Sequence, residues 1–149
     1  MAEGKYGKYL VKKPAREVGA GSGIKGRTIP TLTYMSNDLV PGSNTYIEVG
    51  WIHEIPDPNP HVLSHSHDYD EIVIHIGADP DNPEYLGAEI EFVVGDEKLI
   101  LDKTSAVYLP KGTKHGPLTW KKFEKPHIEM AIMLGAGTLK QAGMGGLDK

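Results

Sequence analysis

The sequence predicts an all-β protein, either a sandwich or a barrel, folded as a single domain. Short apolar or alternating stretches recur along the chain, and residues that favour turns bound each of them. The 18 glycines and 11 prolines are spread through the 149 residues rather than gathered in one linker. No stretch of ten or more residues has convincing helical periodicity. A chain of this length fits one domain and buries roughly 68–70% of its unfolded surface on folding.

The strand pattern can be followed from residue 30 to residue 134. The segment TYIEVGWIHEI alternates, and the proline-rich segment after it, residues 55–60, is expected to be a loop. A second loop is expected at residues 78–87, and Gly95-Asp96-Glu97 is expected to turn a hairpin. The predicted strands lie at residues 30–35, 45–55, 61–67, 71–76, 89–94, 98–101, 106–109 and 127–134.

Both ends of the chain lie outside the main strand pattern. We expect residues 1–40 to form an N-terminal arm with edge strands, one of them at Tyr9–Val11, beside a barrel at residues 41–135. Residues 136–149 are Gly-rich and are expected to form a short, flexible C-terminal tail. The arm is basic, and we interpret it as packing along the barrel or on a neighbouring subunit. A polyanion-binding arm is the alternative.

Composition removes several classes of function. The net charge of −4 gives no sign of the basic face that nucleic-acid-binding domains carry, so no nucleic-acid partner is expected. The chain has no cysteine, which excludes disulfides, thiolate metal ligands and thiol nucleophiles. Neither a signal peptide nor an apolar run of about 20 residues is present, so we expect a cytoplasmic protein that does not enter a membrane.

Histidines cluster in the middle of the chain, and His65-Ser66-His67 is the central feature. In a strand, side chains at positions i and i+2 point to the same face about 6.6 Å apart, so two imidazoles can converge on one ion. Glu71 would lie about 13 Å from His67 on a straight strand. A reversal at residues 68–70, which include two aspartates, returns Glu71 to the side of His67.

Two further histidines are assigned by the same reasoning. His75 lies about 13 Å from Glu71 along the returning strand, so we exclude it as a ligand and expect an interior or interface position. His115 is the best candidate for a fourth ligand. It follows the turn at residues 110–114, which could direct it inward at the start of a new strand.

The pattern HxHxxxE at residues 65–71, followed by PxGxxH at residues 110–115, resembles the two motifs of the cupin superfamily. The likeness is to small single-domain metal-binding cupins of the "cupin 2 conserved barrel" type, and it covers roughly residues 40–135. Some positions depart from the family pattern. Asn59 stands where a glycine is expected and Gly77 falls one residue early, while Thr104 and Thr119 replace a glycine and an asparagine.

The resemblance implies a double-stranded β-helix, a jelly-roll-like barrel in which the two motifs lie on neighbouring strand pairs. It also implies that His65, His67, Glu71 and His115 together bind one divalent transition metal. Three imidazoles and a carboxylate admit Fe, Mn, Zn or Ni. A calcium site at the acidic loop is not expected, because the regular ligand spacing of a calcium loop is absent.

Two polar residues begin the otherwise apolar final strand. If their face points inward, Glu129 is a candidate general base and His127 a candidate proton donor or ligand contact, whereas on the rim both would simply face water. By family analogy we expect a metal-dependent enzyme acting on a small polar or anionic metabolite, as an isomerase, a decarboxylase or lyase, or a dioxygenase. A non-catalytic metal-dependent module that binds or senses a small molecule is the alternative, and a structural or storage protein is the third. Terminal arms and uncovered edge strands favour a homodimer.

Overall fold

The computed structural model describes residues 4–16, 24–28 and 32–137. Within these residues the chain forms strands and one short 3-10 helix, which agrees with the all-β prediction. The elements are η1 (Gly7–Tyr9), β1 (Ala15–Arg16), β2 (Lys25–Arg27), β3 (Leu32–Met35), β4 (Thr45–Asp57), β5 (Asp70–Gly77), β6 (Tyr85–Val94), β7 (Glu97–Lys103), β8 (Ser105–Leu109), β9 (His115–Phe123) and β10 (His127–Leu134).

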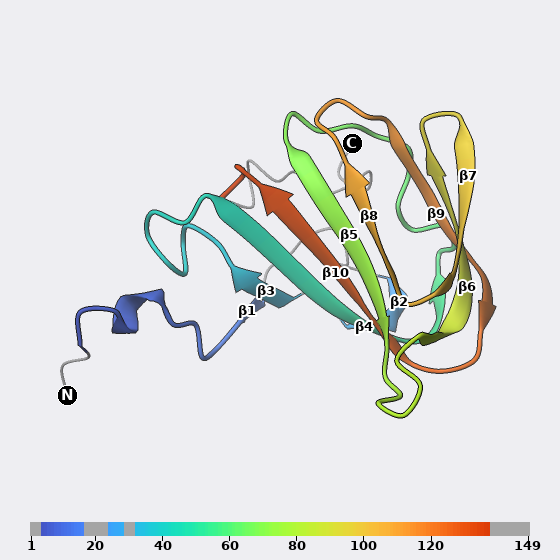
Figure 1. Ribbon diagram of the computed structural model, residues 1–149, viewed down its shortest axis with the longest axis horizontal. Coiled ribbons are helices and arrows are strands. Elements are labelled where there is room, and N and C mark those ends of the chain that lie inside the picture. The colour runs from blue at the N-terminus through green and yellow to red at the C-terminus, as the bar shows by residue number, and fades with distance from the viewer. Residues whose placement is uncertain (1–3, 17–23, 29–31, 138–149) are drawn as a thin grey trace.

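Two antiparallel sheets make up the fold (Figure 1). The larger sheet has the strand order β1-β3-β4-β10-β5-β8, and β2 pairs with β4 as well. The smaller sheet has the order β7-β6-β9. The last strand, β10, lies between β4 and β5, so that Glu129 stands opposite Gly50 on one side and His75 on the other. This insertion carries the polar head of β10 into the middle of the larger sheet.

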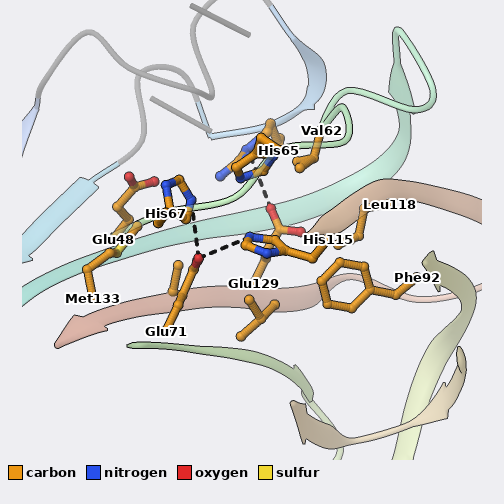
Figure 2. Close-up of a pocket in the computed structure, with 13 residues that line it drawn as sticks. Glu48, Val62, His65, His67, Glu71, Phe92, His115, Leu118, Glu129 and Met133 are labelled. Carbon is orange, nitrogen blue, oxygen red and sulfur yellow. Dashed lines mark ion pairs between the residues drawn. The ribbon is translucent and has the colours of Figure 1, made fainter. Parts of the chain in front are cut away.

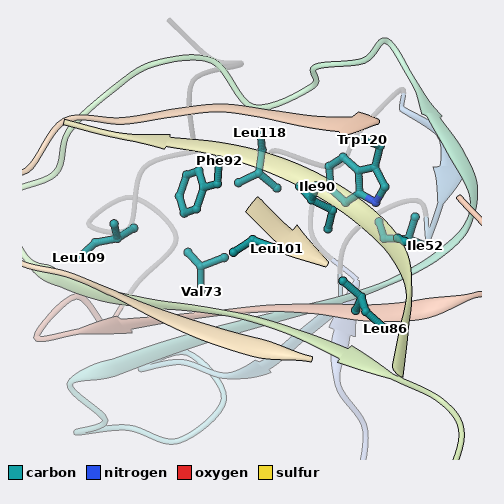
Figure 3. Packing of buried hydrophobic residues seen from close by; sticks show 10 residues of the cluster. Ile52, Val73, Leu86, Ile90, Phe92, Leu101, Leu109, Leu118 and Trp120 are labelled. Carbon is teal, nitrogen blue, oxygen red and sulfur yellow. The ribbon is translucent and has the colours of Figure 1, made fainter. Parts of the chain in front are cut away.

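The main hydrophobic core lies between the sheets (Figure 3). Phe92 and Ile90 of β6 meet Leu118 and Trp120 of β9, and Val73 of β5 faces them from the larger sheet. The alternation of buried and more exposed residues along β5 and β6 is what a sheet with one face on the core requires. A smaller cluster, formed by Tyr46, Met133 and Ala136, fills space away from this core.

Most predicted strands agree with the structure to within a few residues, including the hairpin of β6 and β7. The strand predicted at residues 61–67 is wrong. This segment pairs only through two isolated bridges, Val62 with Leu118 and His65 with His115, so no continuous ladder forms. The loop predicted from residue 55 begins later, because β2 pairs with β4 as far as Asp57 and keeps it extended.

The chain termini differ in part from the expected edge strand and tail. The edge strand predicted at Tyr9–Val11 is wrong, because the chain forms η1 at Gly7–Tyr9 and then an irregular turn. Ala136 is buried against Tyr46 and Met133, while residues 138–149 of the predicted tail lie outside the described residues. The boundaries at residues 40 and 135 stay predictions. Among the described residues, no helix has both the length and the apolar character needed to cross a membrane.

Candidate metal centre

Three histidines converge at one end of the space between the sheets (Figure 2). His65 and His67 lie on the loop that connects β4 to β5, and His115 is the first residue of β9. One nitrogen of each imidazole lies within 4.8 Å of the corresponding nitrogens of the other two. The backbones of His65 and His115 exchange two hydrogen bonds of 2.8 Å, and this pairing fixes the loop to β9. The two sequence motifs, about 50 residues apart, therefore meet at a direct backbone contact.

Glu71 completes the group from the larger sheet. It is the second residue of β5, after the chain bends at Asp68 and Tyr69 as the spacing argument requires. Its Oε1 lies 3.4 Å from Nε2 of His67 and 3.4 Å from Nε2 of His115. Figure 2 shows the carboxylate directed toward these two rings. The structure thus brings together all four side chains of the predicted ligand set.

Backbone carbonyls orient two of the imidazoles. Nδ1 of His65 lies 2.6 Å from the carbonyl oxygen of Leu63, and Nδ1 of His115 lies 2.8 Å from that of Thr113. A carbonyl oxygen only accepts, so each Nδ1 must carry the proton and donate it. This tautomer leaves Nε2 with a lone pair, which is the form that binds a metal ion.

The donor set fits a divalent cation. Oε1 of Glu71 and Nε2 of His115 are both buried, and neither has a hydrogen-bond partner among the residues that the structure describes. A buried carboxylate oxygen and a buried imidazole lone pair are costly when unsatisfied, and a cation would satisfy both. Three imidazoles with a carboxylate suit zinc and the neighbouring first-row ions.

A cavity of about 70 Å³ opens beside this group. Apolar side chains from both sheets form part of its wall, and the charged groups Arg27, Glu48 and Glu129 form another part. A cavity of about 10–15 Å³ holds one water molecule, so this space suits a compound of a few heavy atoms. The apolar part of the wall consists of Val62, Val73, Phe92, Leu118, Ala131 and Met133.

Glu129 points into this cavity, and Arg27 pairs with it. Nη1 of Arg27 lies 3.0 Å from Oε1 of Glu129, and Nε2 of His75 lies 2.9 Å from Oε2. Burial raises the pKa of Glu129, but the Arg27 charge and hydrogen bonds with His61 and His75 outweigh it, so the pKa lies well below the usual range. Such a carboxylate is a weak proton acceptor near neutral pH. Its role as a general base stays a prediction.

His127 lies outside the cavity wall. Its Nε2 accepts a 3.0 Å hydrogen bond from Nε1 of Trp120, and its Nδ1 donates to the carbonyl oxygen of Lys125 at 3.1 Å. Burial lowers the pKa of His127, and the backbone hydrogen bond only partly offsets this effect. Both ring nitrogens are therefore engaged in a neutral imidazole, and the geometry gives no support to a proton-donor role.

Sequence reasoning missed Arg27 as part of the site. It belongs to β2, in the segment expected to form an arm, and the strand pairing of Arg27 with Ile52 brings it over the cavity. Its guanidinium packs over Gly50, where a Cβ would lie 2.6 Å from Nη2. A glycine in the middle of an alternating strand is a signal of close approach that could have indicated this contact. His75 was expected at an interior or interface position, and it is fully buried in the interior.

Comparisons with known proteins agree with this architecture. No family model matches the sequence, and no curated protein matches it. A solved oxalate oxidase matches with a TM-score of 0.54 and 9% identity, over 92% of this chain and 64% of that chain. An RmlC-like cupin from Shewanella frigidimarina matches with a TM-score of 0.48 and 13% identity, over 83% and 84%. A DMSP lyase matches with a TM-score of 0.48 and 15% identity, over 72% and 47%.

The chain spans less than two thirds of the oxalate oxidase and about half of the DMSP lyase. At such low identity, the likeness to the oxalate oxidase concerns the fold. That likeness agrees with the two-sheet architecture. The chain therefore has the cupin fold, a double-stranded β-helix barrel, as its two sequence motifs predict.

Proposed function

We propose that this protein binds one divalent transition metal through His65, His67, Glu71 and His115, and that it is a metal-dependent enzyme acting on a small polar or anionic metabolite. The observation that carries the metal proposal is the pair of unsatisfied buried atoms, Oε1 of Glu71 and Nε2 of His115, which lie 3.4 Å apart. Without a cation, this arrangement places a carboxylate beside an imidazole lone pair with no proton to share.

The cavity beside the ligands supports a small-molecule substrate or ligand. When bound, the ion would supply Lewis acidity to a polar group of that compound, or oxygen activation if it is iron. The apolar wall, with Phe92 and Leu118, would exclude water from the compound. The ion pair of Arg27 and Glu129 would contact polar groups of the bound compound. An isomerase, a decarboxylase or lyase, or a dioxygenase would each be compatible with this environment.

The metal assignment is tested on protein purified without a histidine tag. Metal content is measured by plasma mass spectrometry in the parent, in His67→Ala and in His115→Ala. His53→Ala is the matched control, because His53 is exposed on β4 and stands apart from the cluster. We expect about one first-row metal per chain in the parent and in the control, and loss of the metal in the other two variants. A parent that takes up no metal on reconstitution would refute the assignment.

The alternative is a non-catalytic module that binds or senses a metabolite through the same metal. A low turnover rate alone would not distinguish a poor enzyme from a binding module. Binding and turnover are therefore compared for the same compounds. Small carboxylic and keto acids are screened on the metal-loaded protein, binding by calorimetry and conversion by NMR. Conversion that is lost in His67→Ala supports the enzyme. Stoichiometric binding without conversion, also lost in His67→Ala, supports the binding module.

A further inference from the structure

Three carboxylates line the cavity, and only one of them belongs to the proposed ligand set. Glu71 enters from β5, Glu129 from β10 and Glu48 from β4. Figure 2 shows all three among the side chains that surround the cavity. Glu129 is held by Arg27 and His75, as described above. The metal site gives no role to Glu48, so its place in the wall requires a separate explanation.

The strand register sets Glu48 apart from the ligand Glu71. Glu48 stands opposite Ala131 of β10, and Ala131 stands opposite Val73 of β5. Glu71 precedes Val73 by two residues on the same face of β5, so two strand spacings and one row separate it from Glu48, about 12 Å between Cα atoms. Ala131 has the smallest side chain of the wall and lies between them. A compound that lies over Ala131 can therefore meet the ligand cluster and Glu48 at the same time.

The ion pair in the wall adds little attraction for an anion. Among the described residues that line the cavity, Arg27 is the only lysine or arginine. Its Nη1 lies 3.0 Å from Oε1 of Glu129, so the two opposite charges largely cancel at a distance. An anionic group would have to compete with the Glu129 carboxylate for this guanidinium.

The charges of the wall indicate what kind of compound fits. One guanidinium and three carboxylates give the wall a formal charge of −2. Imidazoles are neutral when they bind a metal, so a divalent cation at the ligand cluster would bring the net charge to zero. A cation and the Glu48 carboxylate would then act from different strands of one cavity. An anion would be attracted by the first and repelled by the second, whereas a compound with both charges would be attracted by both.

The volume of the cavity limits the size of such a compound. At about 70 Å³ it has room for about five water molecules. Val73, Phe92 and Leu118 close it with apolar side chains. Alanine and β-alanine, each with about six non-hydrogen atoms, are close to this size.

We propose that the compound bound beside the metal is a small zwitterion of the amino-acid kind, whose carboxylate faces the ligand cluster and whose ammonium group pairs with Glu48. An ammonium group donates up to three hydrogen bonds, and a carboxylate only accepts them. The inference rests on the proposed metal site and narrows the polar or anionic metabolite proposed above to one chemical class.

The test compares two pairs of compounds on protein reconstituted with zinc. Alanine is set against lactate, and β-alanine against 3-hydroxypropionate, so that within each pair an ammonium group replaces a hydroxyl. Calorimetry at about pH 8, where ordinary imidazoles are neutral, gives the dissociation constants. We expect the parent to bind the ammonium compound of at least one pair about tenfold more tightly, because a hydrogen bond between charged groups typically contributes that much.

Glu48→Gln shows whether Glu48 causes this preference. The amide keeps the size of the side chain but has no charge, so the ratio of the two dissociation constants should fall to within about threefold. A preference that persists in this variant would show that the amine binds the metal directly, and it would overturn the inference. Glu54→Gln is the matched control, because Glu54 is an exposed carboxylate of β4 outside the cavity wall, and it should keep the preference of the parent.

A second variant covers the case in which Glu48→Gln does not fold. Glu48→Thr also removes the charge, and threonine is favoured in strands. Plasma mass spectrometry and the melting temperature establish that each variant is zinc-loaded and folded. A parent that binds no zinc refutes the metal site, and this inference with it. A zinc-loaded parent that favours the ammonium compound in neither pair overturns this inference alone.

Discussion

Two of the proposed ligand histidines, His65 and His115, take their orientation from the peptide two residues before them. The carbonyl oxygens of Leu63 and Thr113 accept from Nδ1 of His65 and His115, so the lone pair on each Nε2 faces the centre of the cluster. His67 instead stacks on Tyr69, with ring centroids 4.6 Å apart. The motif spacing predicts which residues meet. The tautomer depends on local backbone geometry, which residue types alone do not reveal.

Glu71→Gln tests the carboxylate as a metal ligand. The amide keeps the size of the side chain but removes the charge that balances the ion. Changes in groups that merely support ligands cost about 10- to 100-fold in metal affinity, and we expect the loss here to be at least that large. Competition with a chelator of known affinity measures it. Glu48→Gln, a change in another carboxylate of the cavity wall, should leave the affinity within a few-fold of the parent. Equal losses in both variants would contradict the assignment.

Glu129→Gln tests the buried ion pair with Arg27. The side chain of Glu129 is 11% exposed, and its loss leaves the guanidinium without its carboxylate, so we expect the free energy of unfolding to fall by about 3–5 kcal/mol at neutral pH. The pKa of Glu129 is lower in the folded than in the unfolded chain. The stabilisation is therefore complete above the unfolded pKa, near 4.5, and is lost as the pH falls toward the folded value.

Urea unfolding of the metal-free protein at several pH values between 3 and 7 checks this dependence. The difference between parent and Glu129→Gln should stay constant from pH 7 to about pH 5 and shrink below that. Glu97→Gln, a change at an exposed position of β7, should show little difference at any pH. A difference that grows as the medium becomes more acidic would show that the sign of the pKa shift is wrong.

At the scale of elements, β2 makes the largest difference between the sequence prediction and the structure. It is three residues long, and its pairing with β4 is interrupted between Lys25 and Arg27. Such a short segment has too few residues for an alternating pattern to be recognised. Its position follows from pairing with a strand that lies about 25 residues further along the chain. The charged partner of Glu129 was therefore not predictable from local sequence.

Close packing of the loop before β5 on β9 gives an element-scale prediction at Gly116. A Cβ at Gly116 would lie 2.5 Å from the carbonyl oxygen of Leu63, and the residue has φ of +97°. Gly116→Ala should therefore push the His65 segment away from His115 and weaken metal binding as well as stability. Gly112→Ala is the matched control, because Gly112 has φ of +82° but open space around its Cβ position.

Chelator competition and urea unfolding distinguish the two glycine variants. The control should lose about 1–2 kcal/mol of stability from backbone strain and keep its metal affinity. Gly116→Ala should lose more stability and bind the metal at least about tenfold more weakly, as expected when the support of a ligand is disturbed. Similar metal affinities in the two variants would show that the close approach to Leu63 does not position His65.

For the whole molecule, metal binding should raise the free energy of unfolding. An ion that binds only the folded chain stabilises it by about 4.1 kcal/mol at a concentration 1,000 times its dissociation constant. Thermal unfolding with the metal and with a chelator measures the effect, and His115→Ala should show none. A melting temperature of the parent that is the same in both conditions would contradict a folded-state metal site.

How far the fold could be predicted depended on how local each signal was. The hairpin at Gly95 and the strand that begins at His127 follow from turn residues and alternation, and both were correct. The segment with His65 was wrongly predicted as a strand, because its extended form comes from two bridges to β9 rather than from a ladder. The four candidate ligands were found because their spacing is a sequence property. The ion pair of Arg27 and Glu129 in the wall of the same cavity depends on contacts between segments that are distant in the sequence.

The distribution of the four proposed ligands along the chain has a consequence for the lifetime of the protein. His65, His67 and Glu71 lie within seven residues, and His115 follows about 50 residues later. A bound ion would cross-link these two segments in the folded chain only, so unfolding would release the ion and its binding free energy would add to the free energy of unfolding. The chain has no cysteine and cannot form a disulfide, so this cross-link would be lost whenever the metal is removed. Resistance to proteolysis should therefore rise with the availability of the metal. A cell depleted of the metal would degrade the metal-free protein faster than the metal-bound protein.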